Sequence, residues 1–247
     1  MTVRLYQFAI SHYCEKIRWA LDHKAVHYQT VNLLPGQHIG PVRKLTGAGS
    51  SVPVLDDNGV IVQGSAAIID HLDEHFPENP LTPRSPVERD EALAWEHRLD
   101  EEAGPAVRIW CYHYLLQRPK RVIPMLTAGT PFYNRILLSL AFSRVDETMR
   151  KWMKINQKTA DAAEPVMAGL LAELAEAYRD RPFLVGNRLS RADLAAGALF
   201  APLFQPAQYP VPWPAPRHLL PPMSAWLASV EEDLAPVADM YQANRGG

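Results

Sequence analysis

The stretch FAISHYCEKIRWAL, residues 8–21, places Ser11 between a short apolar segment and a helical segment. Many redox proteins carry a reactive thiol at such a junction, because a helix N-terminus lowers the pKa of a sulfur beside it. A hydroxyl there donates a charge-assisted hydrogen bond that favours a thiolate over a thiol. The chemistry that this position suggests is thiolate stabilisation, and the alternative is that Ser11 only caps the helix.

Cys14, three positions after Ser11, is the nearest sulfur of the protein itself. It shares a helical spacing with Ile17 and Leu21, which is typical of a small core residue. We interpret Cys14 as part of the core, and a redox nucleophile at this position is the alternative.

The segment around Ser11 belongs to an alternation of strand and helix patterns in the first third of the chain. Two apolar runs flank the first helical segment, so we expect a βαβ unit with parallel strands. Two further strands flank DDNG, where Asn58 and Gly59 tolerate the positive φ of a tight hairpin turn. The expected elements are strands at 3–8, 25–31, 52–55 and 60–63 and helices at 14–21 and 65–76, the latter opened by Ser65.

Proline and polar residues dominate PENPLTPRSP, residues 77–86, and the pattern after them is helical. We therefore expect an α/β domain at 1–77, a linker at 78–87 and an all-helical domain at 88–247. The fold class is α/β followed by all-α.

Two serines in the helical domain have the spacing of capping boxes, Ser85 with Glu88 and Ser190 with Asp193. The pair Gly104-Pro105 is expected to bend or break the first long helix. Further helices are expected at 164–180 and 183–203, a loop with one or two helices at 118–160, and extended or irregular chain at 205–222.

Composition restricts the class of protein. The 247 residues are 47% apolar and carry a formal charge of -2, with no long basic run, so neither nucleic acid nor a membrane is an expected partner. The chain has two cysteines and its start shows no secretory signal, which predicts a cytoplasmic protein. No cluster of His, Cys and carboxylates has metal-ligand spacing, so no metal site is expected.

The βαβ-ββα order, Ser11 at the first strand–helix junction, VPVL before the hairpin and the Ser-x-x-Asp box in a helical second domain resemble a cytosolic glutathione transferase of the bacterial-like, serine type. The resemblance implies a thioredoxin-like domain in which S-H-Y-C replaces C-x-x-C, so the reacting thiol belongs to glutathione as co-substrate. It implies conjugation of glutathione to small hydrophobic electrophiles, a detoxification reaction, with Ser11 as the catalytic residue. It also implies a homodimer.

The same resemblance assigns the residues that bind glutathione. A cis bond between Val52 and Pro53 would leave the Val52 backbone free to pair with the cysteine part of the tripeptide, as in β-strand addition. Ser65 would bind the γ-glutamyl carboxylate at a helix N-terminus. Many members carry an acidic residue just before this serine, whereas this chain has Gln63 and Gly64. His38 would face the glycine carboxylate, or else be a solvent-facing loop residue.

Aromatic residues are candidates for the electrophile pocket. We assign Tyr13, Trp110 and Tyr114 to it, with Tyr112 nearby in the sequence, although such a stripe can equally be core. The 118–160 segment is long for the family at this point, and we interpret it as an insertion that reshapes or covers the pocket. Two rival functions remain open: a glutathione-binding or scaffold protein without turnover, favoured by Gly64, and a glutathione-dependent thiol reductase that uses Cys14.

Overall fold

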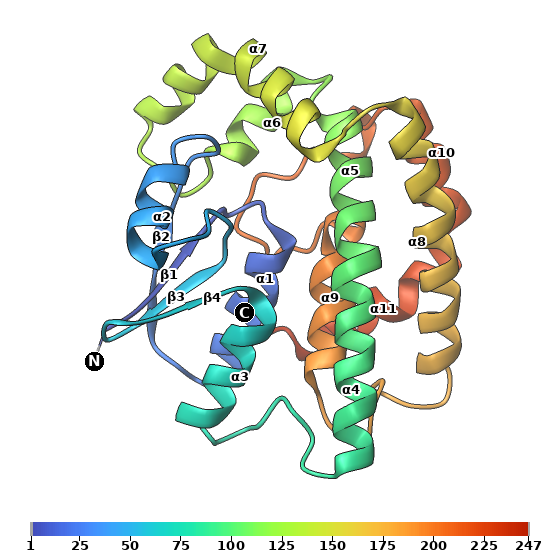
Figure 1. Cartoon of the computed structure of the whole chain (residues 1–247). Helices are drawn as coiled ribbons and strands as arrows, with labels where there is room; N and C mark the ends of the chain where they lie inside the picture. Colours follow the sequence, from blue (N-terminus) through green and yellow to red (C-terminus); the bar gives the residue numbers. More distant parts are fainter. Residues whose placement is uncertain (1, 247) are drawn as a thin grey trace.

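Four strands form one mixed sheet in the computed structural model, which describes residues 2–246 (Figure 1). The strand order is β2-β1-β3-β4, with β1 and β2 parallel and β3 antiparallel to both of its neighbours. Asn58 and Gly59 have φ of 52° and 96°, so the predicted hairpin turn is confirmed. The strands are β1 (Val3–Gln7), β2 (Tyr28–Asn32), β3 (Val54–Asp57) and β4 (Val60–Gln63).

Helix α1 (His12–His23) lies between this sheet and the helical part of the chain. It packs against α3 (Ser65–His75) and against α9 (Arg191–Phe204). Because neighbours cover it on several sides, its charged residues Glu15, Lys16 and Arg18 are buried together with the expected Cys14, Ile17 and Leu21. The apolar spacing predicted the helix, but only its neighbours explain the buried charges.

Two local features of the α/β part differ from the prediction. A short helix, α2 (Ile39–Thr46), occupies a segment that reads as a loop because Gly40 and Pro41 fall in its first turn. Helix α3 is capped by Gly64, with φ of 97°, so Ser65 is the first helical residue and makes no capping hydrogen bond. Ser65 therefore does not cap α3 with its side chain.

The remainder of the chain is mostly helical, as predicted, but α9 begins at Arg191 and not at 183, where a helix was expected. The π-helical turn η1 (Leu99–Ala103) interrupts the α-helical path directly before Gly104-Pro105, where a bend or break was expected. The 118–160 segment contains two helices, α6 and α7. The helices are α4 (Pro86–Arg98), α5 (Gly104–Leu115), α6 (Pro119–Leu126), α7 (Tyr133–Met153), α8 (Gln157–Tyr178), α9, α10 (Pro221–Ser229) and α11 (Glu231–Asn244), with a 3₁₀ turn, η2 (Pro216–His218), within an otherwise irregular stretch.

The two expected capping boxes have different outcomes. Both the backbone N–H and the hydroxyl of Ser190 donate to Asp193 Oδ2, at 2.9 and 2.8 Å, so this box is confirmed. Ser85 precedes α4 but makes no side-chain capping bond, so that box is wrong. Glu88 lies instead beside Gly186 in the loop before α9.

A buried network of charges joins the α/β part to the helices. The Lys16 ammonium on α1 lies 2.7 Å from Glu96 on α4 and 2.8 Å from Asp100. Arg191 at the start of α9 pairs with the same Glu96 and, at 2.6 Å, with Asp70 of α3. These contacts fix α1 and α3 against the helical part. The domain boundaries expected at 77 and 88 stay predictions, and the outer limits of the two domains, residues 1 and 247, lie outside the described residues.

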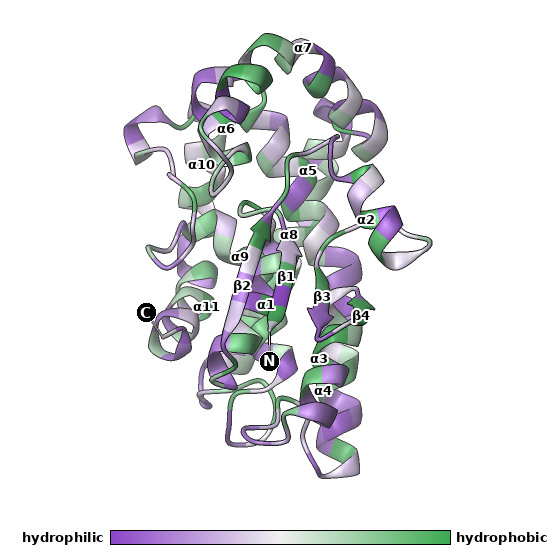
Figure 2. Cartoon of the chain, turned by 90° about the vertical axis from the view of Figure 1, so that its left-hand side faces the viewer, coloured by the Kyte–Doolittle hydropathy of each residue, from purple (hydrophilic) through white to green (hydrophobic). Residues whose placement is uncertain are grey.

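Helix α7 lies at one end of the molecule in both views (Figures 1 and 2). Its first half carries exposed apolar side chains, which are Tyr133, Ile136, Leu137 and Leu140, preceded by Phe132. Its last turn reaches back over the helical part, where Met149 and Met153 pack against the core. Within residues 2–246, none of the helices combines the length and the apolar character that a membrane crossing requires.

Candidate functional site

A cavity of about 350 Å³ opens between the α/β part and the helices, with Ser11 in its wall. Apolar and aromatic side chains make up most of its lining, with few polar groups among them, which is the usual make-up of a small-molecule site. The lining residues that carry the arguments below are Phe8, Ser11, Tyr13, His38, Val52, Arg108, Cys111, Tyr112, Met149, Trp152, Met153 and Trp213.

Ser11 is the N-cap of α1, and its hydroxyl oxygen accepts a hydrogen bond from the Cys14 N–H at 3.4 Å. A serine hydroxyl has one donor hydrogen and two acceptor lone pairs. The cap uses an acceptor, so the O–H remains free to donate, and Ser11 is only half-buried at the cavity wall. Capping and donation to a bound anion are therefore compatible in the same side chain.

Cys14 does not line the cavity, and its side chain is fully buried. Burial is the largest influence on the pKa of its thiol and raises it. Cys111 on α5 does line the cavity, and burial raises its pKa to about 12. Both protein thiols are thus held in the protonated form, which reacts slowly as a nucleophile.

His12 and Tyr13, the first residues of α1, attach Ser11 to the helical part. His12 Nε2 lies 3.0 Å from the carbonyl oxygen of Gly104, and burial followed by the nearby Arg108 lowers the pKa of His12 to about 3. The Tyr13 hydroxyl donates to the carbonyl oxygen of Asp100 at 2.5 Å, and burial raises its pKa to about 12. Both side chains are neutral at pH 7 and their donors are engaged.

Val52 and Pro53 form a cis peptide bond, as the resemblance implies. Val52 lines the cavity, and within residues 2–246 neither its N–H nor its carbonyl is hydrogen-bonded. The carbonyl of Pro53, in contrast, accepts from the Gly64 N–H at 3.1 Å. The unpaired backbone of Val52 has the donor and acceptor that an extended peptide needs to add to a sheet edge.

His38 stands at the start of α2 and also lines the cavity. Its Nδ1 accepts from the Gly36 N–H at 3.1 Å, and its ring packs edge-on against Phe8 with centroids 4.8 Å apart. Burial lowers the pKa of His38, so the ring is neutral at pH 7. Since Nδ1 is the acceptor, the proton of the neutral ring sits on Nε2, which is available to donate.

Gln63 ends β4, Gly64 and Ser65 follow it, and none of the three lines the cavity that contains Ser11. The Gln63 amide donates to the backbone carbonyl of Ser51 at 2.8 Å and to its hydroxyl at 3.2 Å, so its oxygen is the atom left to accept. Ser65 is buried at the N-terminus of α3, and its hydroxyl has no hydrogen-bond partner in the described part of the chain.

The expected aromatic stripe divides between two faces of α5. Trp110 and Tyr114, four residues apart, pack together in the core with ring centroids 5.2 Å apart, and the Trp110 indole N–H donates to Glu164 at 3.0 Å. Neither lines the cavity, whereas Tyr112, two residues from each, does. Side chains two residues apart on a helix point in different directions, so the three aromatics cannot share one wall.

Sequence reasoning missed several cavity residues. Arg108, Cys111 and Leu115 line it from the same face of α5 as Tyr112, and the spacing of three, four and seven residues from Arg108 is a signal that the sequence contains. Thr148, Met149, Trp152 and Met153 line it from the last turns of α7. The 118–160 segment thus contributes residues to the cavity wall, while its interpretation as an insertion that reshapes or covers the pocket stays a prediction.

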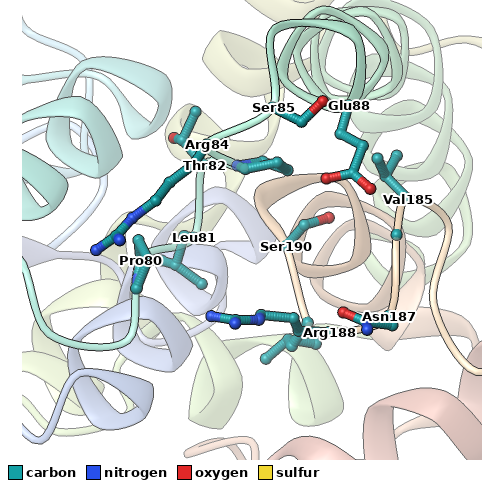
Figure 3. Close-up of a pocket in the computed structure, with 13 residues that line it drawn as sticks. Pro80, Leu81, Thr82, Arg84, Ser85, Glu88, Val185, Asn187, Arg188 and Ser190 are labelled. Atoms are coloured by element: carbon teal, nitrogen blue, oxygen red, sulfur yellow. The ribbon is translucent and has the colours of Figure 1, made fainter.

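A second cavity, of about 280 Å³, lies between the linker before α4 and the loop before α9 (Figure 3). Arg84, Ser85 and Glu88 stand on one side and Asn187 and Arg188 on the other. It shares no lining residue with the cavity of Ser11, and its polar side chains are largely exposed. Among residues 2–246 there is no group of three or more His, Cys, Asp or Glu residues placed to hold a metal ion.

Two family models match the chain. The model described as "Glutathione S-transferase, N-terminal domain" matches residues 5–80, and "Glutathione S-transferase, C-terminal domain" matches residues 125–233. The first match contains Ser11, Val52 and Ser65, and the second contains α7, α8 and α9.

Similar proteins include a glutathione S-transferase 1 of Dianthus caryophyllus, 40% identical over 85 residues, which are 33% of this chain and 38% of that protein. A stringent starvation protein A homologue of Pasteurella multocida is 30% identical over 95 residues, or 38% of this chain and 44% of that one. The matched part is thus less than half of either relative. A theta class glutathione S-transferase from Xanthomonas axonopodis pv. citri, solved with glutathione bound, has a TM-score of 0.60 at 20% identity and covers 99% of this chain and 97% of its own. At that identity the likeness shows the fold, a thioredoxin-like domain followed by a helical one.

Proposed function

This chain belongs to the glutathione S-transferase superfamily, and we propose that it conjugates the thiol of glutathione to small hydrophobic electrophiles. The observation that carries the proposal is the Ser11 hydroxyl, which faces an apolar cavity from the N-terminus of α1 with its O–H free to donate. Glutathione is the co-substrate, and no protein thiol takes part.

Ser11 would act by keeping the glutathione thiol ionised. A cysteine thiol has a pKa of about 8.5, so most of it is protonated at pH 7. Lowering that pKa by ~2 units requires ~2.7 kcal/mol of preferential stabilisation of the thiolate. One charge-assisted hydrogen bond and the dipole of α1 together supply about this amount. The thiolate sulfur then attacks the electrophilic carbon: the C–S bond forms, the leaving group departs with the bonding electron pair, and the thiol proton passes to solvent.

The other assigned residues would orient the tripeptide. The unpaired backbone of Val52 after the chain turns at Pro53 suits the cysteine part, and the Nε2–H of neutral His38 suits the glycine carboxylate. The free hydroxyl of Ser65 and the α3 N-terminus suit the γ-glutamyl carboxylate, and the Gln63 oxygen suits its amine. Orientation of this kind makes the encounter of the two substrates effectively intramolecular.

The second substrate would occupy the apolar part of the cavity. Tyr13 and Tyr112 line it, and the last turns of α7 close it on another side. Trp110 and Tyr114 have no part in the proposal, because they are core residues. We propose in addition that the protein works in the cytoplasm as a homodimer, in a detoxifying role; light scattering of the purified protein tests the dimer directly.

Conjugation of 1-chloro-2,4-dinitrobenzene tests the reaction. We expect Ser11→Ala to lower kcat/KM by about 10- to 100-fold at pH 6.5, and to raise the apparent pKa of the pH–rate profile by about 1–2 units. Cys14→Ala, which changes a buried side chain outside the cavity, is the control and should stay within about threefold.

Other outcomes point to the rival functions. Loss of activity in Cys14→Ala with an unchanged Ser11→Ala would contradict the proposal in favour of a thiol reductase, a role that the burial of Cys14 does not favour. Calorimetric binding of glutathione without turnover would indicate a non-catalytic glutathione-binding protein. If the protein does not bind glutathione at all, both the transferase proposal and the non-catalytic binding alternative would be wrong.

A further inference from the structure

Arg108 is the one cation in the wall of the Ser11 cavity, taken over the residues that the structure describes. It lies on α5 beside Val107 and Cys111, and its Nε is buried with no hydrogen-bond partner. No carboxylate of residues 2–246 forms an ion pair with its guanidinium, whereas the buried lysines and arginines of this part of the chain are each paired: Lys16, Arg18, Lys24, Arg191 and Arg245. Arg108 is thus a charge that the protein places in a cavity and does not neutralise.

The neighbours of Arg108 do not compensate for this charge. His12 and Tyr13 lie close enough to feel its field, and both are neutral at pH 7. Asp100, a partly buried carboxylate that acts on Tyr13 as Arg108 does, is already held by the Lys16 ammonium at 2.9 and 2.8 Å. Arg108 is half-buried, and its Nε is shielded from water without a partner, which is unfavourable, so an acceptor on a ligand in the cavity would satisfy it.

The rest of the wall indicates what that partner looks like. Apart from Arg108 and the hydroxyls of Tyr112 and Thr148, the part of the cavity formed by α5, α7 and the chain near 213 is mostly apolar. Its apolar side chains include Leu115, Met149, Met153 and Trp213. A guanidinium pairs best with a planar anion such as a carboxylate, which accepts two parallel N–H bonds. The complementary ligand therefore has an apolar body with a single carboxylate at one end.

We propose that the second substrate of this protein is a hydrophobic electrophile that carries a carboxylate, and that Arg108 binds this carboxylate. The inference rests on the proposed transferase function and makes its substrate class specific. Because His38 is the residue assigned to the glycine carboxylate of glutathione, Arg108 should affect the electrophile and leave glutathione binding unchanged.

A matched pair of electrophiles tests the inference. In 4-chloro-3,5-dinitrobenzoate and its methyl ester the glutathione sulfur attacks the carbon that bears chlorine; the C–S bond forms and chloride leaves with the electron pair of the C–Cl bond. We expect kcat/KM for the acid to exceed that for the ester by at least tenfold after correction for the uncatalysed rates. Arg108→Met should abolish this preference, and Arg108→Lys should retain part of it.

The control variant is Arg135→Met, which removes an exposed arginine of α7 outside the cavity. It should leave the preference for the acid unchanged, and the KM for glutathione should be the same in all four proteins. A preference that is absent in the native protein, or that survives in Arg108→Met, overturns the inference. A rise in the KM for glutathione in Arg108→Met also overturns it, since Arg108 would then bind the peptide.

Binding without turnover separates this inference from the proposed function. Trp152 and Trp213 line the cavity, so unreactive 3,5-dinitrobenzoate should quench their fluorescence with a Kd at least tenfold higher in Arg108→Met, while methyl 3,5-dinitrobenzoate binds both proteins equally. If neither chlorinated compound is conjugated, the transferase proposal fails and this titration alone decides the role of Arg108. Equal Kd values for the acid in the native and Arg108→Met proteins would then refute it.

Discussion

His12 Nε2 lies 3.0 Å from the carbonyl oxygen of Gly104, so the first residue of α1 is hydrogen-bonded to the first residue of α5. Ser11 is the residue immediately before His12. The C-terminal ends of α1 and α5 lead into different parts of the molecule (Figure 1). The position of Ser11 relative to the cavity wall on α5 therefore depends on a buried, neutral imidazole.

The buried His12 predicts an acid-dependent loss of stability. Its pKa falls from 6.5 to about 3 on folding, so below pH 6.5 the unfolded chain takes up a proton that the folded chain does not. Stability should fall with decreasing pH in this window, by about 1.4 kcal/mol per unit, which is about 2 kcal/mol between pH 6.5 and pH 5. The free energy of unfolding, measured in urea at several pH values, should depend on pH more steeply in the native protein than in His12→Gln, which cannot titrate. The difference between the two slopes should correspond to the uptake of about one proton. Parallel pH profiles would contradict this.

Gly104 predicts a packing effect at the same junction. A Cβ at this position would overlap the Tyr13 hydroxyl, which itself is held by Asp100. Gly104→Ala should lower the free energy of unfolding by about 1–3 kcal/mol, even though alanine is the better helix former. Gly169→Ala in α8 is the matched control: nothing lies within 4 Å of its Cβ, and it should stabilise the protein by about 0.5–1 kcal/mol. Chemical denaturation of both variants checks the opposite signs.

Most of the sheet could be predicted from the sequence, because its strands and the turn between β3 and β4 depend on local patterns. Asn58-Gly59 predicts the β3–β4 hairpin from the φ preferences of two residues, and Ser190 with Asp193 predicts the start of α9 from their spacing alone. The same spacing wrongly predicts a capping box for Ser85 and Glu88, because Glu88 lies beside the loop before α9. A capping pattern is reliable only where no tertiary neighbour competes for its side chains.

The cavity wall was harder to predict, since periodicity identifies the faces of a helix but not what each face contacts. Trp110 and Tyr114 lie on the core face of α5, and Arg108 and Tyr112 lie on the cavity face, which only the packing of α8 and α7 distinguishes. The buried charges of α1, such as Lys16, depend on partners about 80 residues away. His38 and Val52 were assigned through the resemblance, whereas Arg108 and the α7 residues, which helix packing brings to the cavity, were not predicted individually.

The pair formed by Arg191 and Glu96 predicts a large cost for removing one charge from the interior. Both side chains are 2% exposed, and Arg191 also holds Asp70 and Thr82. Arg191→Met leaves Glu96 with Lys16 as its remaining partner, and we expect a loss of about 3–5 kcal/mol, the range for a broken buried pair. Arg98→Met is the control, because its pair with Glu173 is 40% and 49% exposed and contributes under about 1 kcal/mol. Similar losses in the two variants would show that burial of the first pair does not matter.

The tautomer of His38 gives a test of the glutathione site that does not involve Ser11. The Gly36 N–H occupies Nδ1, so only Nε2–H is available to a carboxylate in the cavity. Asparagine at this position keeps an acceptor near Nδ1 but has no atom near Nε2. His38→Asn should therefore raise the KM for glutathione by about 10- to 150-fold, the effect of losing one hydrogen bond to a charged group. The KM for the electrophile and the thermal midpoint should change little. Gln37→Ala, which truncates the exposed neighbouring side chain, should leave both KM values as they are. If the KM for glutathione in His38→Asn stays at the native value, His38 belongs to the α2 loop and not to the peptide site.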